Sequence, residues 1–301
     1  SDAMELSTES LAEYAITLSM SDIPDEIVER SKRLVIDSIG VAVGTYSTEP
    51  IKKLRRQYAG LSGTDENATV FGADHPMEMS HAAFINASMV RYMDFNDTYI
   101  GGLGGCHPSD HIGSLISVAE SVGASGAELI EAITIAYEIQ CNGIDTMEMW
   151  GRGFDYVVWG GYAQAAAAGK LMGLSKTQLR NAIGITAKSN NGIMAARMGE
   201  VSMWKGIAQP YAQHNAIQAC TMAREGITGP IDAFEVPSGG VFEVLSDGPI
   251  EYDEFGEKNE KIGQTAIKSY TCGYGAHPAV YGILTLQEEQ TVTNEDIKSI
   301  T

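Results

Sequence analysis

Residues 93–111 concentrate polar side chains that can carry out acid–base chemistry. The segment contains three aspartates, two histidines and a threonine, interspersed with four glycines between positions 101 and 105. Helix-like segments flank it, because 79–93 is rich in Ala and Met and Pro108 precedes the apolar run 112–122. Titratable groups held between two packed helices are typical of a small-molecule site. The alternative is a solvated loop whose Asp and Asn residues only cap helices.

Two patterns in this segment resemble ligand-binding motifs but lack essential parts of them. His107 and His111 have the spacing of metal ligands on a helix, but Pro108 stands where a zinc-protease motif needs glutamate. The glycines at 101–105 lack a preceding strand and a following lysine, so flexibility explains them better than phosphate binding. We therefore expect no metal and no cofactor at this site.

Lys205 is a second candidate for chemistry. It falls in the first turn of a helix predicted to begin at Ser202, next to Trp204. A helix N-terminus favours anions, so a lysine there suits a site that binds an anion between its ammonium group and free amides. Arg197 lies a few residues upstream and is expected to join it. The alternative is a lysine whose stem covers apolar surface while its charge stays in water.

Composition and charge narrow the class of protein. The chain has 301 residues, 44% hydrophobic and 20% charged, as expected of a soluble globular protein with a sizeable core. A net charge of −19 argues against nucleic acid or an anionic membrane as partners. Four scattered cysteines favour a reducing cytoplasm, and we find no membrane span and no signal peptide. Ser1-Asp2-Ala3 before Met4 is expected to be a cloning remnant.

Helical periodicity dominates the first 240 residues and predicts a mainly α fold of about eight helices. A helix capped by Ser7 or Thr8 opens the series, and Pro210 should kink or split the one predicted over 202–223. From residue 236 glycine, proline and the acidic stretch 251–260 mark a linker. A new unit follows, with a helix expected over 276–289 and residues 296–301 alternating like the start of a strand.

Five short motifs, taken together, carry a family resemblance. They are Asp94-Phe95-Asn96-Asp97-Thr98, His107-Pro108-Ser109, Ser202-Met203-Trp204-Lys205-Gly206, Gly226-Ile227-Thr228-Gly229-Pro230, and Lys268-Ser269-Tyr270-Thr271-Cys272 with His277. In this order they resemble the 2-methylcitrate dehydratase (MmgE/PrpD) family, which also contains cis-aconitate decarboxylase and an iminodisuccinate epimerase. The similarity extends from about Ile16 to Ile300.

The resemblance implies an all-α domain, a smaller α+β lid domain, no cofactor and a homodimer. We accordingly expect an all-α helical domain over 4–265 and the beginning of an incomplete lid domain over 266–301. The glycine-rich insertion before His107 is longer than the family pattern, so this histidine is expected to be displaced. The resemblance assigns Asp94, Thr98, His107, Lys205 and His277 to a site, which we complete with Arg197 and Lys268. The expected catalytic residues are Asp94, His107, Lys205 and His277, and the expected substrate-binding residues are Thr98, Arg197 and Lys268.

The resemblance implies a lyase that acts on a small di- or tricarboxylic acid. Among the possible reactions, we expect elimination of water from a 2-methylcitrate-like substrate first. Such a reaction needs a base beside the acidic carbon, an acid for the leaving hydroxyl, and cations for the carboxylates. Decarboxylation of the cis-aconitate type and epimerisation of the iminodisuccinate type need the same groups and stay open. A non-catalytic helical dimerisation module is the alternative from another class.

Overall fold

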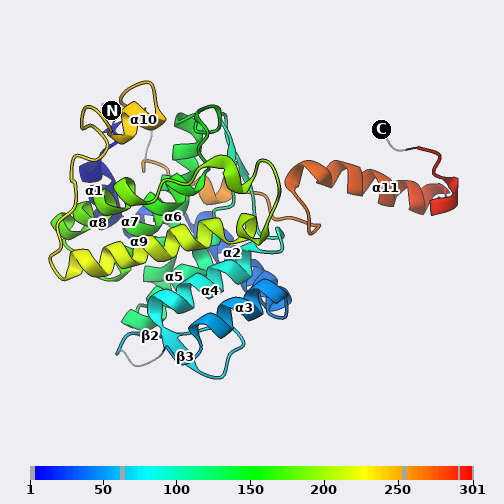
Figure 1. The fold of residues 1–301 in the computed structure, drawn as a ribbon, viewed down its shortest axis with the longest axis horizontal. Helices are drawn as coiled ribbons and strands as arrows, with labels where there is room; N and C mark the ends of the chain where they lie inside the picture. Colours follow the sequence, from blue (N-terminus) through cyan, green and yellow to red (C-terminus); the bar gives the residue numbers. More distant parts are fainter. Residues whose placement is uncertain (1–3, 62–64, 253–255, 291, 300–301) are drawn as a thin grey trace.

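Eleven α-helices make up most of the described chain, which comprises residues 4–61, 65–252, 256–290 and 292–299 of a computed structural model (Figure 1). The first six helices are α1 Thr8–Thr17, α2 Asp25–Thr45, α3 Glu49–Tyr58, α4 Met79–Arg91, α5 Asp110–Val122 and α6 Gly126–Thr146. The others are α7 Val157–Leu171, α8 Lys176–Ser189, α9 Ala208–Arg224, α10 Val241–Leu245 and α11 His277–Gln290. Short 3₁₀ turns connect them: η1 Met20–Asp22, η2 Trp150–Arg152, η3 Met194–Ala196, η4 Met203–Gly206, η5 Lys261–Gln264, η6 Tyr274–Ala276 and η7 Asn294–Asp296. The prediction of a mainly α fold is confirmed.

The described strands form three antiparallel pairs of two or three residues per strand. They are β1 Met4–Glu5 with β6 Glu251–Tyr252, β2 Asn67–Thr69 with β3 Pro76–Glu78, and β4 Tyr99–Ile100 with β5 Gly105–Cys106. The third pair is a hairpin that precedes His107 and brings Tyr99 opposite Cys106. The hairpin therefore determines where the polar residues of the segment 93–111 lie.

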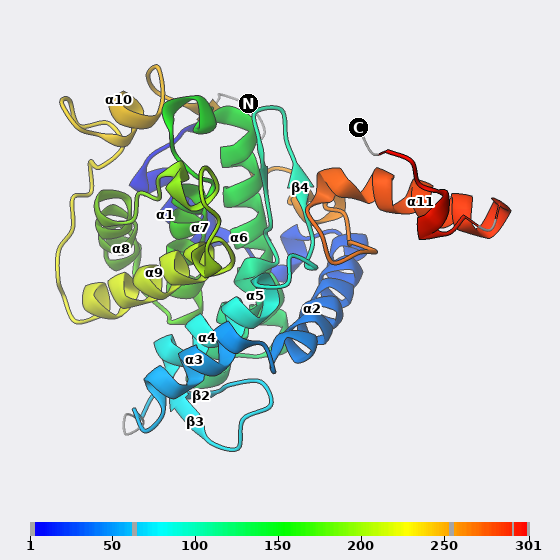
Figure 2. The ribbon, with the colours of Figure 1, turned by 45° about the vertical axis from the view of Figure 1, so that its right-hand side comes forward.

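Two buried helices, α4 and α7, form the centre of the fold. Thirteen of the fifteen residues of α7 are buried, and twelve of the thirteen residues of α4. α7 packs against α6, α8 and α9, and α4 packs against α5 and α9 (Figures 1 and 2). Helices that are apolar on every face are stable only when other helices surround them. The four consecutive alanines at 165–168 are small enough to allow that close packing.

Local sequence signals account for where several helices begin. Ser7 caps α1 by accepting a hydrogen bond from the backbone amide of Ser10. Pro210 lies in the first turn of α9, where a missing amide hydrogen costs nothing, and the predicted 202–223 helix is divided into η4 and α9. Gly113 of α5 allows close contact with α4, because a Cβ atom there would lie 2.7 Å from the backbone of Asn86.

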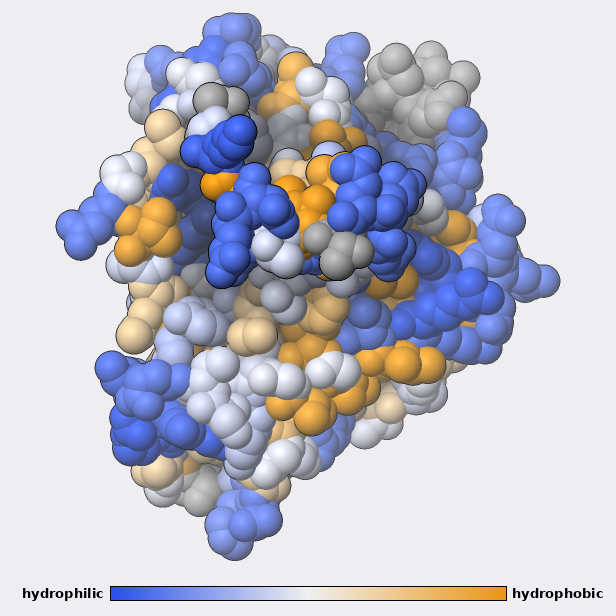
Figure 3. Space-filling view, turned by 90° about the vertical axis from the view of Figure 1, so that its right-hand side faces the viewer, coloured by the Kyte–Doolittle hydropathy of each residue, from blue (hydrophilic) through white to orange (hydrophobic). Residues whose placement is uncertain are grey.

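The last described helix, α11, extends away from the rest of the protein (Figures 1 and 2). None of its residues is buried, and Tyr281, Ile283 and Leu284 are exposed. Apolar surface lies between hydrophilic patches on the face from which α11 projects (Figure 3). The 3₁₀ turn η7 occupies 294–296 and the described residues 297–299 form no strand, so the strand predicted from residue 296 is wrong there. The division at residue 265 stays a prediction.

Within the described ranges, no helix has both the length and the apolar character needed to cross a membrane. Residues 1–3, interpreted above as a cloning remnant, and residues 253–255 of the acidic linker lie outside the described residues.

Candidate active site

A cleft of about 270 Å³ lies between the end of α4 and the turn η4. Two cationic side chains and one carboxylate face it, namely Arg91, Lys205 and Asp94. The other residues around it are Tyr92, Met93, Val201, Ser202, Met203 and Gly206. The chain thus brings together the two candidate segments, around 94 and around 205, that are far apart in the sequence.

Asp94 is the point on which the charged groups of the site converge. Its Oδ1 accepts hydrogen bonds from Arg91 Nη1 at 3.0 Å and from Lys268 Nζ at 2.7 Å. Its backbone has a φ of 52°, a left-handed conformation that is uncommon for any residue except glycine. Burial raises the pKa of this carboxyl, but Arg91, Lys268 and His107 outweigh burial and the pKa falls to about 2. Asp94 is therefore an ionised, fixed anion at neutral pH.

His107 lies next to Asp94 because of the β4–β5 hairpin. The hairpin closes the glycine-rich insertion on itself, with Tyr99 paired to Cys106, so the chain returns to its starting point. Nε2 of His107 is 3.8 Å from Asp94 Oδ1. The displacement of His107 relative to the family pattern stays a prediction. The hairpin also lies beside the segment leading to α11, since Thr98 and Ala266 form an antiparallel bridge (Figure 2).

The hydrogen bond of the second ring nitrogen fixes the tautomer of His107. Nδ1 lies 2.8 Å from the carbonyl oxygen of Asp97, and a carbonyl oxygen only accepts, so Nδ1 carries the hydrogen. Nε2 is then the atom with a free lone pair. Burial lowers the pKa of His107 well below its ordinary value, and the charges of Arg91 and Lys268 lower it further, against the effect of Asp94. The imidazole is thus a neutral base at physiological pH.

Lys205 lies in the four-residue turn η4, which Ser202 caps as predicted by accepting a hydrogen bond from Trp204. Its ammonium group has no hydrogen-bond or ion-pair partner among the described residues. The argument from a helix dipole is wrong here, because a single 3₁₀ turn aligns too few peptide groups to produce one. What makes Lys205 suitable for an anion is its place in the cleft.

Lys268 and Thr98 are both buried next to this site, and their polar atoms are occupied. The ammonium group of Lys268 contacts three oxygens: the carbonyl and Oδ1 of Asp94 and, at 3.2 Å, the carbonyl of Cys272. Its three hydrogens are therefore used within the protein. The hydroxyl of Thr98 lies 3.4 Å from the carbonyl of Cys106. In this structure Lys268 holds Asp94 rather than facing the cleft.

Arg197 and His277 lie outside the group formed by Asp94, His107 and Lys205. Arg197 donates to Asp155 at 2.8 Å and its guanidinium covers the ring of Tyr156. His277 begins α11 and contacts the rings of Tyr270 and Tyr274. No described contact joins it to Asp94 or His107, although a Cβ atom at Gly273, four residues earlier, would be 3.9 Å from Asp94 Oδ2.

Sequence reasoning missed three residues that surround the site, Arg91, Asp110 and Tyr156. Arg91 is only 2% exposed and contacts both of the others: Nε is 3.3 Å from the Tyr156 hydroxyl and 3.8 Å from Asp110 Oδ2. Burial raises the pKa of Asp110 to about 7, against the effects of Arg91 and Asn96. A signal was present, because Arg91 stands three residues before Asp94 at the end of a helix that is otherwise small and apolar.

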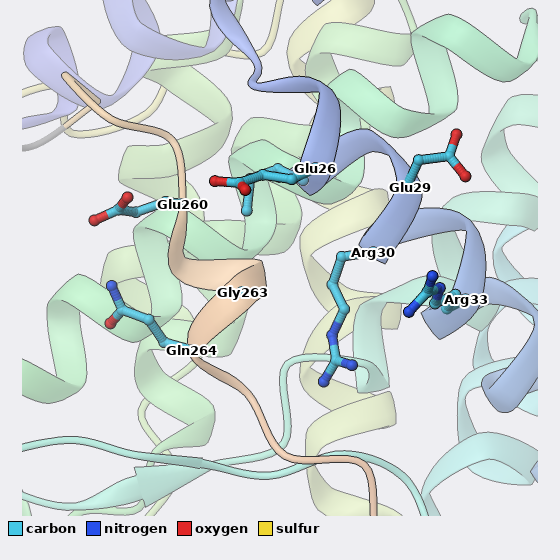
Figure 4. A pocket seen from close by; sticks show the side chains of 8 residues that line it. Glu26, Glu29, Arg30, Arg33, Glu260, Gly263 and Gln264 are labelled. Atoms are coloured by element: carbon cyan, nitrogen blue, oxygen red, sulfur yellow. The ribbon is translucent and has the colours of Figure 1, made fainter.

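Other features of the surface do not involve these residues. A hollow of about 670 Å³ lies between α2 and η5 and has mixed charges, with Arg30 and Arg33 among Glu26, Glu29 and Glu260 (Figure 4). His111, the partner in the predicted metal-spacing pair, is buried against Gln140 and Gln164 rather than beside His107. In the described ranges, no group of three or more His, Cys, Asp or Glu side chains is arranged to hold a metal ion.

The mainly α fold agrees with membership of a known family of helical proteins. The sequence profile of the MmgE/PrpD N-terminal domain matches residues 9–253, and the chain belongs to the MmgE/PrpD family. Cis-aconitate decarboxylase of Homo sapiens is 27% identical over 246 residues, covering 77% of this chain and 49% of its own length. The Mus musculus decarboxylase is 29% identical over 77% of this chain and 48% of its own length. 2-Methylcitrate dehydratase of Escherichia coli (strain K12) is 24% identical over 89% of this chain and 58% of its own length. The chain thus spans about half the length of these curated relatives.

Proposed function

We propose that this chain belongs to a lyase that acts on a small di- or tricarboxylic acid. The reaction that we propose first is elimination of water from a 2-methylcitrate-like substrate. One observation carries the proposal: a neutral histidine with a free Nε2 lies 3.8 Å from an ionised aspartate. That aspartate lines a cleft together with Lys205 and Arg91. His107 and Lys205 supply the base and a cation for a carboxylate, both of which the reaction requires.

The base in this proposal is His107. Its Nε2 takes a proton from the carbon next to a substrate carboxylate, and the electron pair of the broken C–H bond forms the new double bond. The hydroxyl on the neighbouring carbon leaves as water after it receives a proton. His277 is proposed as the acid, because it follows closely on the segment beside Asp94.

Asp94 and Lys205 have electrostatic roles. Asp94 cannot donate a proton near neutral pH, because its pKa is about 2, so it stabilises the imidazolium that forms on His107. Lys205 lines the cleft, its ammonium group has no partner in the described part of the chain, and it is proposed to hold a substrate carboxylate. Arg197, Thr98 and Lys268 remain proposed substrate-binding residues, and in this structure each contacts protein groups instead.

Decarboxylation of a cis-aconitate-like acid is the second candidate. It is favoured by the 27% and 29% identities to the mammalian decarboxylases, whereas the dehydratase at 24% aligns over more of this chain. Both reactions build up negative charge on carbon beside a carboxylate, which the same cations stabilise. An epimerisation of the iminodisuccinate type uses the same proton abstraction.

The test is turnover of 2-methylcitrate, citrate, cis-aconitate and iminodisuccinate by the complete gene product, followed by proton NMR of the mixtures. His107→Gln should abolish turnover, and His75→Gln should not, because His75 is an exposed residue of a turn outside the site. A folded protein that turns over none of these acids would contradict the proposal and favour a non-catalytic dimerisation module.

We further propose a homodimer in the cytoplasm that requires neither metal nor organic cofactor and binds neither nucleic acid nor membrane. The net charge of −19 supports the absence of polyanionic partners, and four free cysteines support a reducing compartment. Light scattering of the purified protein tests the homodimer. Metal analysis, together with an activity assay in the presence of a chelator, tests whether a metal is required.

A further inference from the structure

Arg91 is a buried arginine in a protein that has few basic residues. It is the last residue of α4 and is 2% exposed. A guanidinium cannot lose its charge in a protein, so burial is tolerated only where several partners compensate it. Its contacts therefore show which groups of the fold compensate this buried charge.

One side of the guanidinium holds Asp94. Nη1 donates to Asp94 Oδ1 at 3.0 Å, across the three-residue spacing that brings the end of α4 beside the turn after it. Lys268 holds the same oxygen from the other part of the chain. Because Asp94 also has a left-handed backbone, its carboxylate is fixed both by its φ angle and by two cations.

The other side of the guanidinium reaches two more elements. Nε is 3.3 Å from the hydroxyl of Tyr156, which precedes α7, and 3.8 Å from Oδ2 of Asp110, the first residue of α5. The ring of Tyr156 in turn contacts the ring of His107 edge-on, with centroids 5.9 Å apart. Arg91 thus connects the ends of α4, α5 and α7 that surround His107.

We propose that Arg91 is a positioning residue, whose guanidinium fixes Asp94, Tyr156 and the first turn of α5 around the imidazole of His107. The inference rests on the proposed function in one respect, namely that His107 is the base. Arg91 acts through its neighbours, because its contacts are with Asp94, Asp110 and Tyr156. The charged and titratable groups facing His107 are Arg91, Asp94, Asp110, Tyr156 and Lys268.

The test compares Arg91→Met, which keeps the apolar stem and removes the charge, with Arg91→Lys, which keeps a charge. Arg224→Met is the matched control, because Arg224 also ends a helix and pairs with a carboxylate, Glu66, but lies away from the site. Histidine ¹⁵N NMR follows the titration of His107 without substrate. The chain has only six histidines, so His107→Gln suffices to assign the signal.

Removing the guanidinium charge should raise the pKa of His107 by about one unit or more, since a nearby like charge disfavours the imidazolium. Arg91→Lys and Arg224→Met should leave that pKa within about 0.3 units of the wild type. Turnover by Arg91→Met at neutral pH should fall on the order of 100-fold, mainly in kcat, because misplacement of a base slows the chemical step more than binding.

Arg91→Gln, which removes the charge but keeps an amide that can donate to Asp94, carries the same expectation if Arg91→Met does not fold. An unchanged His107 pKa in either folded variant would overturn the positioning role. The NMR readout needs no turnover, so a shifted pKa in a protein inactive on every acid would refute the proposed function alone. Turnover with an unshifted pKa would refute only the role of Arg91.

Discussion

Two aspartates on either side of Arg91 have pKa values displaced in opposite directions. Asp94 has a pKa of about 2, although burial alone would raise it, because Arg91 and Lys268 stabilise its charge at short range. Burial raises the pKa of Asp110 to about 7, because its nearest guanidinium nitrogen is 3.8 Å away. Carboxylates with divergent pKa values are typical of sites that divide electrostatic and proton-holding roles.

For Lys205, the change to test is Lys205→Met, which keeps the length of the side chain and removes its charge. If Lys205 holds a substrate carboxylate through the transition state, kcat/KM should fall roughly 30- to 1000-fold, or about 2–4 kcal/mol. The melting temperature should hardly change, because the ammonium group has no described partner to lose. Lys52→Met, at an exposed position of α3, is the control and should keep wild-type kinetics. Normal kinetics with a lower melting temperature would make Lys205 structural.

The depressed pKa of Asp94 predicts a specific dependence of stability on pH. A carboxyl whose pKa is lower in the folded state stabilises the protein above its unfolded pKa near 4, and this contribution is lost as the pH falls towards 2. Asp94→Asn should therefore lower the free energy of unfolding by about 2 kcal/mol at pH 7.

Urea unfolding at several pH values measures this difference between wild type and Asp94→Asn. It should be constant from pH 5 to 8 and should shrink below pH 4, where the wild-type carboxyl becomes protonated. A difference that stays the same down to pH 2.5 would show that Asp94 has an ordinary pKa.

At the scale of elements, the contact between α4 and α5 positions both halves of the site. Asp94 follows α4 and His107 precedes α5, and Gly113 lets the two helices approach. Gly113→Ala should destabilise the protein by about 1–3 kcal/mol, because the new Cβ atom would lie 2.7 Å from backbone that cannot move aside. Gly40→Ala in α2 is the control, since nothing lies within 4 Å of its added Cβ atom.

That control should gain stability, by up to about 1 kcal/mol, because alanine is the better helix former. Urea unfolding of both variants provides the comparison. Equal stabilisation by the two substitutions would mean that α4 and α5 are not in close contact at Gly113.

Helices were predictable from the sequence because apolar periodicity and caps are local signals. The Ser7 cap and the place of Pro210 in the first turn of α9 follow from residue types alone. The course of the glycine-rich insertion was not predictable, since its closure depends on pairing of Tyr99 with Cys106 and on the bridge from Thr98 to Ala266. Long-range partners of this kind leave no periodic trace in the sequence.

The candidate site was predicted only in part for the same reason. Asp94, His107 and Lys205 carry conspicuous functional groups in short motifs, and the structure brings the three together. Tyr156 looks like an ordinary helix residue in the sequence, and only packing shows its contacts with Arg91 and His107. The engagement of all three Lys268 hydrogens within the protein is likewise a property of the folded chain.

At the scale of the whole molecule, the net charge of −19 opposes the approach of a polycarboxylate, while Lys205 is expected to attract it locally. Salt screens the distant acidic groups first, because the Debye length falls from about 30 Å at 0.01 M to about 8 Å at 0.15 M. Contacts of 3–4 Å inside the cleft are hardly screened. The kcat/KM for a tricarboxylate should therefore rise roughly 3- to 10-fold over this range of sodium chloride. Salt acts on the diffusional encounter of substrate and protein, so kcat should change little. Sucrose at matched osmolality should leave kcat/KM unchanged. A kcat/KM that falls with added salt would show that the local cations, and not the net charge, control the approach of the substrate.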